Sequence, residues 1–512
     1  MVSRKWRKVG AGSGAGLLVA ALITPGAAFA QAPENILPEA MASSAAPAQP
    51  AARVPLRNPG KPSPRLAGPT PAASPTPAPT AKPTAAPSAR PTPTPTIAAS
   101  PLAPDLNSPE AATSAAAGPP VFVPVEEPVM NWGVADAQAL LDVIRAIGRE
   151  GLFPADYQPA ELAAAIAAGP GDALDQQASR SFDWLAEDLR DGRTPMSARV
   201  QWFAVDPDQD KWPTRDVLSQ ALETHDIAGT LGALTPTYPD YAALREALAM
   251  VSPLDKAKRA LIRANMDRWR WLPRDLGQIY LLVNVPEFQV RLMRDDKIVR
   301  TYKAIVGKPG DTATPQLAEQ VKAVVFNPTW TVPQSIIQKE GLADKLRAHP
   351  RAGYKLTENA DGSVTVVQQP GKNNSLGEMK IDMPNPHAIY LHDTPQKALF
   401  DKPVRAFSHG CIRTERAVEL GMTMAMMGAN MTIQQAIDLY NSKKYNRVPM
   451  TRTFPVYITY FTVARDINGE MSIFNDIYGR DAPVLASFAR PREMHTTQRS
   501  SAEAVVKLDN PL

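Results

Sequence analysis

The chain has 512 residues, of which 52 are proline, and it carries 55 basic and 51 acidic residues. This length allows two or three compact domains, although the proline excess lies mainly near the N-terminus and leaves less of the chain to fold. The first thirty residues hold four of the basic residues and no acidic ones, so the remainder is electrically neutral. A neutral chain lacks the positive surface that nucleic-acid-binding proteins use, and we expect no nucleic-acid partner.

Residues 1–30 have the pattern of a secretory signal peptide. Four basic residues precede an apolar run at residues 9–23, and Ala28-Phe29-Ala30 is a small-x-small cleavage site. We therefore expect a periplasmic or secreted protein of the cell envelope. An uncleaved signal would instead anchor the chain in the membrane, because the apolar run is nearly long enough to span a bilayer.

The composition then changes twice along the chain. Residues 31–128 are mostly Ala, Pro, Thr and Ser. Because such a segment cannot bury enough apolar surface to offset the entropy of ordering, it predicts a disordered tether. Residues 129–275 show apolar side chains at helical spacing, as at Leu140, Leu141 and Ile144, and predict a helical scaffold domain. Its periodicity indicates no chemistry.

Residues 276–482 have the pattern of a β-rich domain. Residues 279–285 form an apolar, β-branched run, and Asn468-Gly469 is a strong turn signal between two late strands. A helix is expected at residues 415–427. Residues 483–512 are expected to form a poorly ordered tail. The predicted fold class is therefore α+β.

The chain has a single cysteine, so no internal disulfide is possible, and the thiol is either buried or reactive. The stretch that contains it reads Ser408-His409-Gly410-Cys411-Ile412-Arg413. A thiolate nucleophile needs a base, most often an imidazole that a third group holds in one tautomer. His392 ends a predicted strand and is the candidate base. Cys411 is expected on a loop leading into a helix, whose N-terminus would favour the thiolate.

The neighbours of Cys411 have both catalytic and structural interpretations. Gly410 allows close approach of the backbone, and the amides of His409, Gly410 and Cys411 are candidates for an oxyanion hole. His409 could equally brace the loop. Arg413 is either an ion-pair partner or a binder of a carboxylate-rich substrate.

The histidines allow two further interpretations. A zinc site made of His392, His409 and Cys411 is the alternative to a nucleophile, but their spacing does not match the short ligand pairs of such sites. His387, on a polar connector, is expected at the surface.

These motifs together resemble the L,D-transpeptidase family with a YkuD-type catalytic domain, in its large subfamily with a scaffold domain. The family pattern is a histidine, about fifteen residues, and Ser/Thr-His-Gly-Cys; here residues 393–407 separate His392 from Ser408. The likeness runs from about residue 131 to 482. The supporting segments are 267–273 (DRWRWLP), 327–333 (NPTWTVP), 390–395 (YLHDTP), 405–413 (RAFSHGCIR) and 476–481 (DIYGRD).

The resemblance implies a role for each matching residue. Cys411 is the nucleophile, His392 the base, Asp393 a support through its backbone carbonyl, and His409 and Gly410 part of the oxyanion loop. Arg413 stands where many relatives have asparagine. The implied reaction acylates Cys411 with a tetrapeptide stem of peptidoglycan, releases D-alanine, and transfers the stem to a diaminopimelate amine as a 3→3 cross-link. This reaction needs neither a metal nor an organic cofactor. The resemblance also implies that the protein reacts with carbapenem-type β-lactams.

The sequence departs from the larger relatives in two places. No room is seen near Met250 for an inserted peptidoglycan-binding module, and the segment between Gln338 and Ser375 looks short. Water or a protein lysine as acceptor, or a non-catalytic wall-binding module, remain rival interpretations. Other wall-synthesis proteins are further candidate partners.

Overall fold

A computed structural model describes residues 121–124, 128–204, 211–351, 353–492 and 497–500. The predicted signal and nearly all of the predicted tether lie outside these residues. No helix in the described ranges combines the length and apolar character needed to cross a bilayer. A helical region is followed by a β-rich one, which confirms the predicted α+β fold class.

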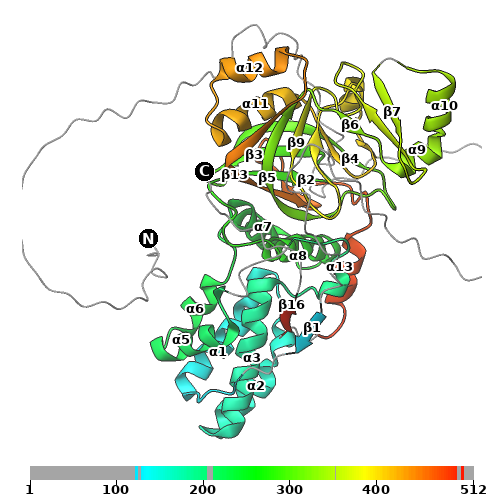
Figure 1. Cartoon of the computed structure of the whole chain (residues 1–512). Helices are drawn as coiled ribbons and strands as arrows, with labels where there is room; N and C mark the ends of the chain where they lie inside the picture. Colours follow the sequence, from blue (N-terminus) through cyan, green and yellow to red (C-terminus); the bar gives the residue numbers. More distant parts are fainter. Residues whose placement is uncertain (1–120, 125–127, 205–210, 352, 493–496, 501–512) are drawn as a thin grey trace, which may run out of the picture. The chain divides into compact units, whose positions relative to one another are not determined.

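Five helices share one hydrophobic core in the first part of the chain (Figure 1). They are α1 (Val134–Ala146), α2 (Pro159–Ala168), α3 (Asp172–Asp191), α5 (Thr214–Thr224) and α6 (Ile227–Ala233). Helix α3 buries Phe182, Leu185 and Leu189, which recur at helical spacing as the sequence predicts. It ends at Gly192, whose φ of 89° lies in the left-handed region that favours glycine.

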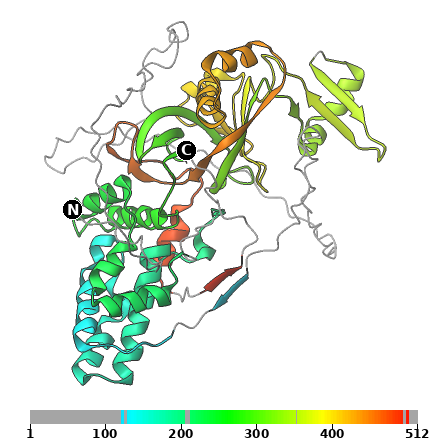
Figure 2. The ribbon, with the colours of Figure 1, turned by 60° about the vertical axis from the view of Figure 1, so that its left-hand side comes forward.

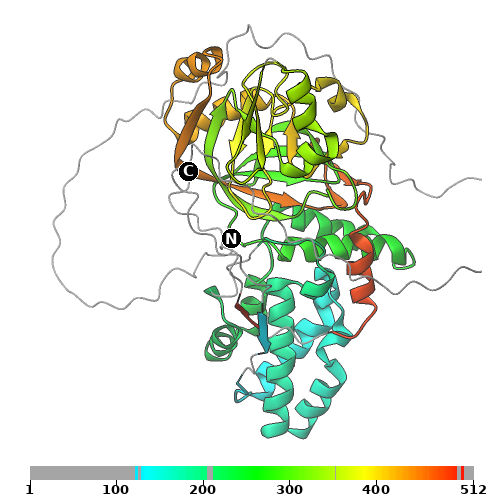
Figure 3. The same ribbon diagram turned by 45° about the vertical axis from the view of Figure 1, so that its right-hand side comes forward.

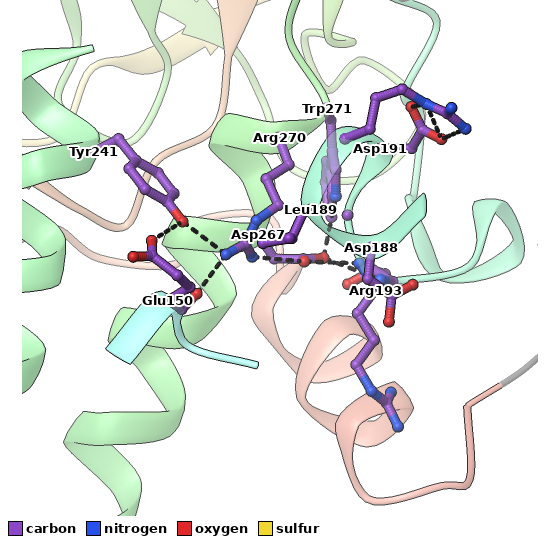
Figure 4. A network of polar contacts seen from close by, with 12 residues as sticks. Glu150, Asp188, Leu189, Asp191, Arg193, Tyr241, Asp267, Arg270 and Trp271 are labelled. Atoms are coloured by element: carbon purple, nitrogen blue, oxygen red, sulfur yellow. Dashed lines mark hydrogen bonds and ion pairs between the residues drawn. The ribbon is translucent and has the colours of Figure 1, made fainter. Parts of the chain in front are cut away.

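Two further helices, α7 (Pro239–Met250) and α8 (Lys256–Arg270), belong to a second core that includes strand residues. A buried polar network surrounds the end of α8 (Figure 4). Asp267 accepts hydrogen bonds from the backbone amides of Arg193 (2.8 Å) and Thr194 (3.0 Å) and from Trp271 Nε1 (3.2 Å). The carboxylate thus holds the segment that follows α3, which gives the first part of the Asp267-to-Pro273 motif a structural role.

The β-rich region is built around a nine-stranded sheet in the order β11-β4-β12-β10-β9-β5-β13-β2-β3. Strand β3 also pairs with β4, so the sheet closes into a barrel and β11 extends it beside β4. The bounds are β2 (Ile279–Asn284), β3 (Gln289–Arg294), β4 (Lys297–Gly307), β5 (Leu317–Phe326), β9 (Met379–Asp382), β10 (Leu391–His392), β11 (Ala406–Ser408), β12 (Ile412–Thr414) and β13 (Asn446–Thr459). Strand β13, orange in Figure 3, pairs with β5 and β2.

Helices and small sheets complete this region. Helices α11 (Ala417–Gly428) and α12 (Ile433–Asn441) pack on the barrel core. The segment between Gln338 and Ser375 contributes to a lobe with its own small core (Figure 1). The lobe contains β6 (Trp330–Thr331), α9 (Gln334–Glu340), α10 (Leu342–Ala348), β7 (Tyr354–Glu358) and β8 (Val364–Gln368). Strands β14 (Val463–Arg465) and β15 (Met471–Ile473) form the hairpin predicted around Asn468-Gly469.

The prediction of a poorly ordered tail from residue 483 is wrong for the first part of that segment. Helix α13 spans Asp481–Phe488, and Arg492 beyond it is buried against Glu187 and Asp188. Strand β16 (Thr497–Ser500) pairs with β1 (Val121–Pro124), the latter inside the predicted tether (Figure 2). These contacts join distant parts of the chain, and local composition does not reveal them.

One local prediction near Cys411 also differs from the structure. The strand predicted to end at His392 is very short, because Ala388 has a φ of 53° and only Leu391–His392 are extended as β10. The cause is a turn held by Asn385, whose Oδ1 accepts from the amides of His387 and Ile389.

Candidate active site

Adjacent strands bring His392 and the cysteine loop together. Strand β10 pairs in parallel with β12, with Leu391 opposite Ile412 and His392 opposite Arg413. Cys411 lies directly before β12, and the amide of Ile412 donates to the carbonyl of Tyr390 at 3.0 Å. The barrel therefore fixes the backbone on both sides of the site.

The ring of His392 is buried and held in one tautomer. Its Nδ1 lies 2.5 Å from the backbone carbonyl of Asp393. A carbonyl oxygen only accepts, so Nδ1 carries the proton and Nε2 keeps its lone pair for a substrate or thiol proton. Burial, reinforced by the positive charge of Arg413, lowers the pKa of His392 to about 3. The Asp393 carboxylate is in turn fixed by Lys397 and by the amide of Glu378 at 3.0 Å.

The Cys411 thiol is partly accessible, and Sγ donates to the carbonyl of Ala388 at 3.4 Å. Burial raises the pKa of Cys411 above its ordinary value, and hydrogen bonding to Tyr390 and the charges of Lys380 and Arg413 oppose that rise without cancelling it. The resting pair is therefore a neutral thiol and a neutral imidazole. The thiolate must form during attack on a substrate.

Ser408 and Gly410 shape the loop. Ser408 Oγ donates to the carbonyl of Cys411 (2.6 Å) and accepts from the amide of Gly410 (3.2 Å). Gly410 has a φ of 116°, and a side chain there would come within 3.1 Å of Ile389. Because the Gly410 amide is already bonded to Ser408, it is not available as an oxyanion donor in this conformation.

The remaining predicted residues lie around this loop. The side chain of His409 is exposed overall. The partial desolvation of its ring, together with the positive charge of Lys308, lowers its pKa. Arg413 is half-buried, and its Nη1 donates to Gln396 Oε1 at 2.8 Å. His387 is not a free surface residue, because its ring packs on Phe203 with centroids 4.1 Å apart.

Two residues near the site were not predicted. Tyr390 precedes His392 by two positions, and their ring centroids are 5.6 Å apart. Its place in the 390–395 segment, beside the candidate base, was a signal that could have found it. Lys380 lies opposite His392 on β9, with Nζ 4.6 Å from the centre of the Tyr390 ring. That position follows from strand pairing, which local sequence does not reveal.

The helix predicted at residues 415–427 is present as α11, but the expectation that its N-terminus supports the Cys411 thiolate is wrong. The loop leads into strand β12, and α11 begins only at Ala417. A helix N-terminus acts mainly over its first turn, so α11 gives the thiolate no direct support. Within the described ranges, no group of three or more His, Cys, Asp or Glu side chains is arranged to hold a metal ion.

Comparison with known proteins places this geometry in context. Residues 278–442 match the profile of the L,D-transpeptidase catalytic domain, and residues 132–248 match that of a scaffold domain. A Haemophilus influenzae protein named "Putative L,D-transpeptidase" is 28% identical over 309 residues, which cover 56% of this chain and 61% of that protein. The chain thus spans about three fifths of the length of this curated relative.

Solved structures with a similar region include two bacterial L,D-transpeptidases. The enzyme from Mycobacterium smegmatis is 14% identical, with 36% of this chain and 59% of that chain covered and a TM-score of 0.19. The Enterococcus faecium enzyme is also 14% identical, with 36% and 50% covered and a TM-score of 0.19. The likeness to the L,D-transpeptidase family therefore rests on the profile matches and the Haemophilus relative.

Proposed function

We propose that this chain is an L,D-transpeptidase, the family indicated by its two profile matches and its Haemophilus relative, and that it uses Cys411 to transfer peptidoglycan peptide stems between neighbouring strands of the cell wall. The observation that supports this most is the arrangement of His392. Its Nδ1 is bonded to the Asp393 carbonyl, which leaves Nε2 as a base on the strand next to the cysteine loop. A pure binding module has no need of such a pair.

The first half of the proposed reaction forms a thioester. Nε2 of His392 takes the Cys411 proton, and sulfur attacks the carbonyl carbon that precedes the terminal D-alanine of a tetrapeptide stem. The tetrahedral intermediate collapses with cleavage of the C–N bond. The imidazolium gives its proton to the departing amine, so D-alanine leaves and the stem stays on sulfur.

The second half releases the stem. The side-chain amine of a diaminopimelate on another stem attacks the thioester carbonyl and loses a proton to His392. The C–S bond then breaks, the thiolate is reprotonated, and a 3→3 cross-link results. Half-buried Arg413 and Lys380 flank His392 and offer positive charge to the carboxylates of the stems. We place this reaction in the cell envelope, in keeping with the predicted signal.

Incubation of the purified protein with disaccharide-tetrapeptides, followed by mass spectrometry, tests the proposal. We expect free D-alanine and a cross-linked dimer, and neither product from Cys411→Ala or His392→Ala. His349→Ala is a matched control, because His349 is exposed on the lobe outside the site. Tripeptide without dimer would identify water as the acceptor. Full activity of Cys411→Ala, or an inactive wild-type protein, would contradict the proposal.

A further inference from the structure

We infer that Thr314 is a positioning residue that aims the backbone N–H of Cys411 at the oxyanion of the reaction. The inference rests on the proposed function, since it concerns the same intermediate. Thr314 follows β4 and lies almost a hundred positions before Cys411 in the chain. Its side chain is fully buried and therefore cannot contact a substrate directly, so any effect it has must pass through the loop.

The Thr314 hydroxyl makes two well-defined hydrogen bonds. Oγ1 donates to the carbonyl of Gly410 at 2.7 Å and accepts from the amide of Gly307 at 2.9 Å. Gly307 ends β4 and leaves no room for a side chain, because a Cβ there would lie 1.8 Å from the carbonyl of Thr312. The hydroxyl is thus anchored to the barrel on one side and to the cysteine loop on the other.

The carbonyl of Gly410 and the N–H of Cys411 belong to one peptide unit. In a planar trans peptide these two groups point in opposite directions. A hydrogen bond that fixes the carbonyl therefore also fixes the direction of the N–H. The Gly410 amide is bonded to Ser408, so the Cys411 amide is the better candidate donor to an oxyanion formed on a carbonyl that sulfur attacks.

The Asp476-to-Asp481 motif supports Thr314 from behind. Tyr478 accepts at its hydroxyl from the Thr314 amide (3.3 Å) and donates to the carbonyl of Gly307 (2.6 Å). Arg480 donates to the carbonyl of Thr314 at 3.1 Å. The amide of Tyr478 is itself held by the hydroxyl of Tyr460 at 2.8 Å. Tyr478 and Arg480 of this motif thus hold Thr314 and Gly307, the two residues through which the hydroxyl is anchored to the barrel.

Two reagents separate this role from a general loosening of the loop. A β-lactam acylates the thiol through a tetrahedral oxyanion, whereas iodoacetamide alkylates it by displacement and forms none. Thr314→Val keeps the volume of the side chain and removes the hydroxyl. We expect acylation to slow by about 10-fold to 100-fold, somewhat less than the loss of an oxyanion donor itself, while alkylation stays within about 2-fold.

Matched variants complete the test. Thr314→Ser retains the hydroxyl and should restore most of the acylation rate. Thr312→Val is the control, because its hydroxyl bonds only to Lys308 in the same loop. Equal loss of both rates in Thr314→Val, or loss of neither, would overturn the inference. A wild-type protein that is alkylated but never acylated would instead contradict the proposed function, so the two failures are distinguishable.

Discussion

The protonation of two side chains sets how Cys411 reacts. Burial lowers the pKa of His392 to about 3 and raises that of Cys411. An imidazole with a lowered pKa stays neutral, and able to accept a proton, even when the pH of the solution falls below 6.5, the ordinary pKa of histidine. The acid limb of the pH–rate profile is therefore shifted to lower pH. The proton of the thiol moves to His392 only as the carbonyl is attacked.

The pH profile of acylation tests this. Between pH 5 and 8 we expect the second-order rate of β-lactam acylation to show no inflection near 6.5, because His392 remains neutral throughout. Arg413→Gln removes a charge that helps to depress the pKa of His392, so the acid limb should move upward in that variant. A wild-type profile that falls tenfold per pH unit below 6.5 would show that His392 titrates normally.

At the residue scale, the sequence points to the candidate reacting groups more readily than to the residues that hold them. Cys411 and His392 were found from residue type and spacing, and the Asp393 carbonyl contact expected from the family resemblance is present in the structure. Lys380 and Thr314 reach the site through strand pairing and long-range hydrogen bonds, which no local pattern encodes. The catalytic roles themselves remain predictions until they are measured.

At the scale of elements, the segment after α13 acts as a strap on the helical region. Arg492 donates to Glu187 (2.6 Å) and Asp188 (3.1 Å), and it lies over the ring of Trp184. All three charged side chains are almost completely buried. Local sequence does not reveal the burial of Arg492, because the basic stretch near residue 490 has no periodicity and ordinarily indicates a solvated tail.

Arg492→Met should therefore destabilise the protein strongly. It leaves two carboxylates buried without their cation, which costs about 3–5 kcal/mol. The free energy of unfolding in urea at pH 7 measures the effect. Arg347→Met is the control, since its ion pairs with Asp344 and Glu358 are exposed to solvent and such surface pairs contribute little to stability. Equal free energies of unfolding for the two variants would show that the segment after α13 contributes nothing to stability.

For the whole molecule, α8 connects the helical region to the catalytic domain. Arg268 forms an ion pair with Asp481 at 2.6 Å, and Asn265 exchanges hydrogen bonds with Thr462 at 2.9 and 3.0 Å. All four side chains are buried. Because charged and polar groups of both regions are satisfied only when the regions are together, we expect them to unfold as one unit.

Deletion of residues 31–120 tests the part of the chain predicted from composition alone. A segment of Ala, Pro, Thr and Ser cannot supply a core. The shortened protein should keep its single unfolding transition, its thermal midpoint and its acylation rate. Two separate transitions would contradict the coupling through α8, and a midpoint lowered by several degrees would show that the deleted segment contributes to the fold.

The central claim, that Cys411 is an acyl-accepting nucleophile, is tested most directly by intact-mass spectrometry of the purified protein after exposure to a carbapenem. The strained lactam carbonyl offers sulfur the same chemistry as the stem carbonyl, and its ring opening adds the whole drug to the protein. We predict one adduct of the drug's mass, mapped to the peptide that contains Cys411, stable for longer than the incubation, and missing from Cys411→Ala. A folded wild-type protein that is alkylated by iodoacetamide but gains no such adduct would contradict the claim.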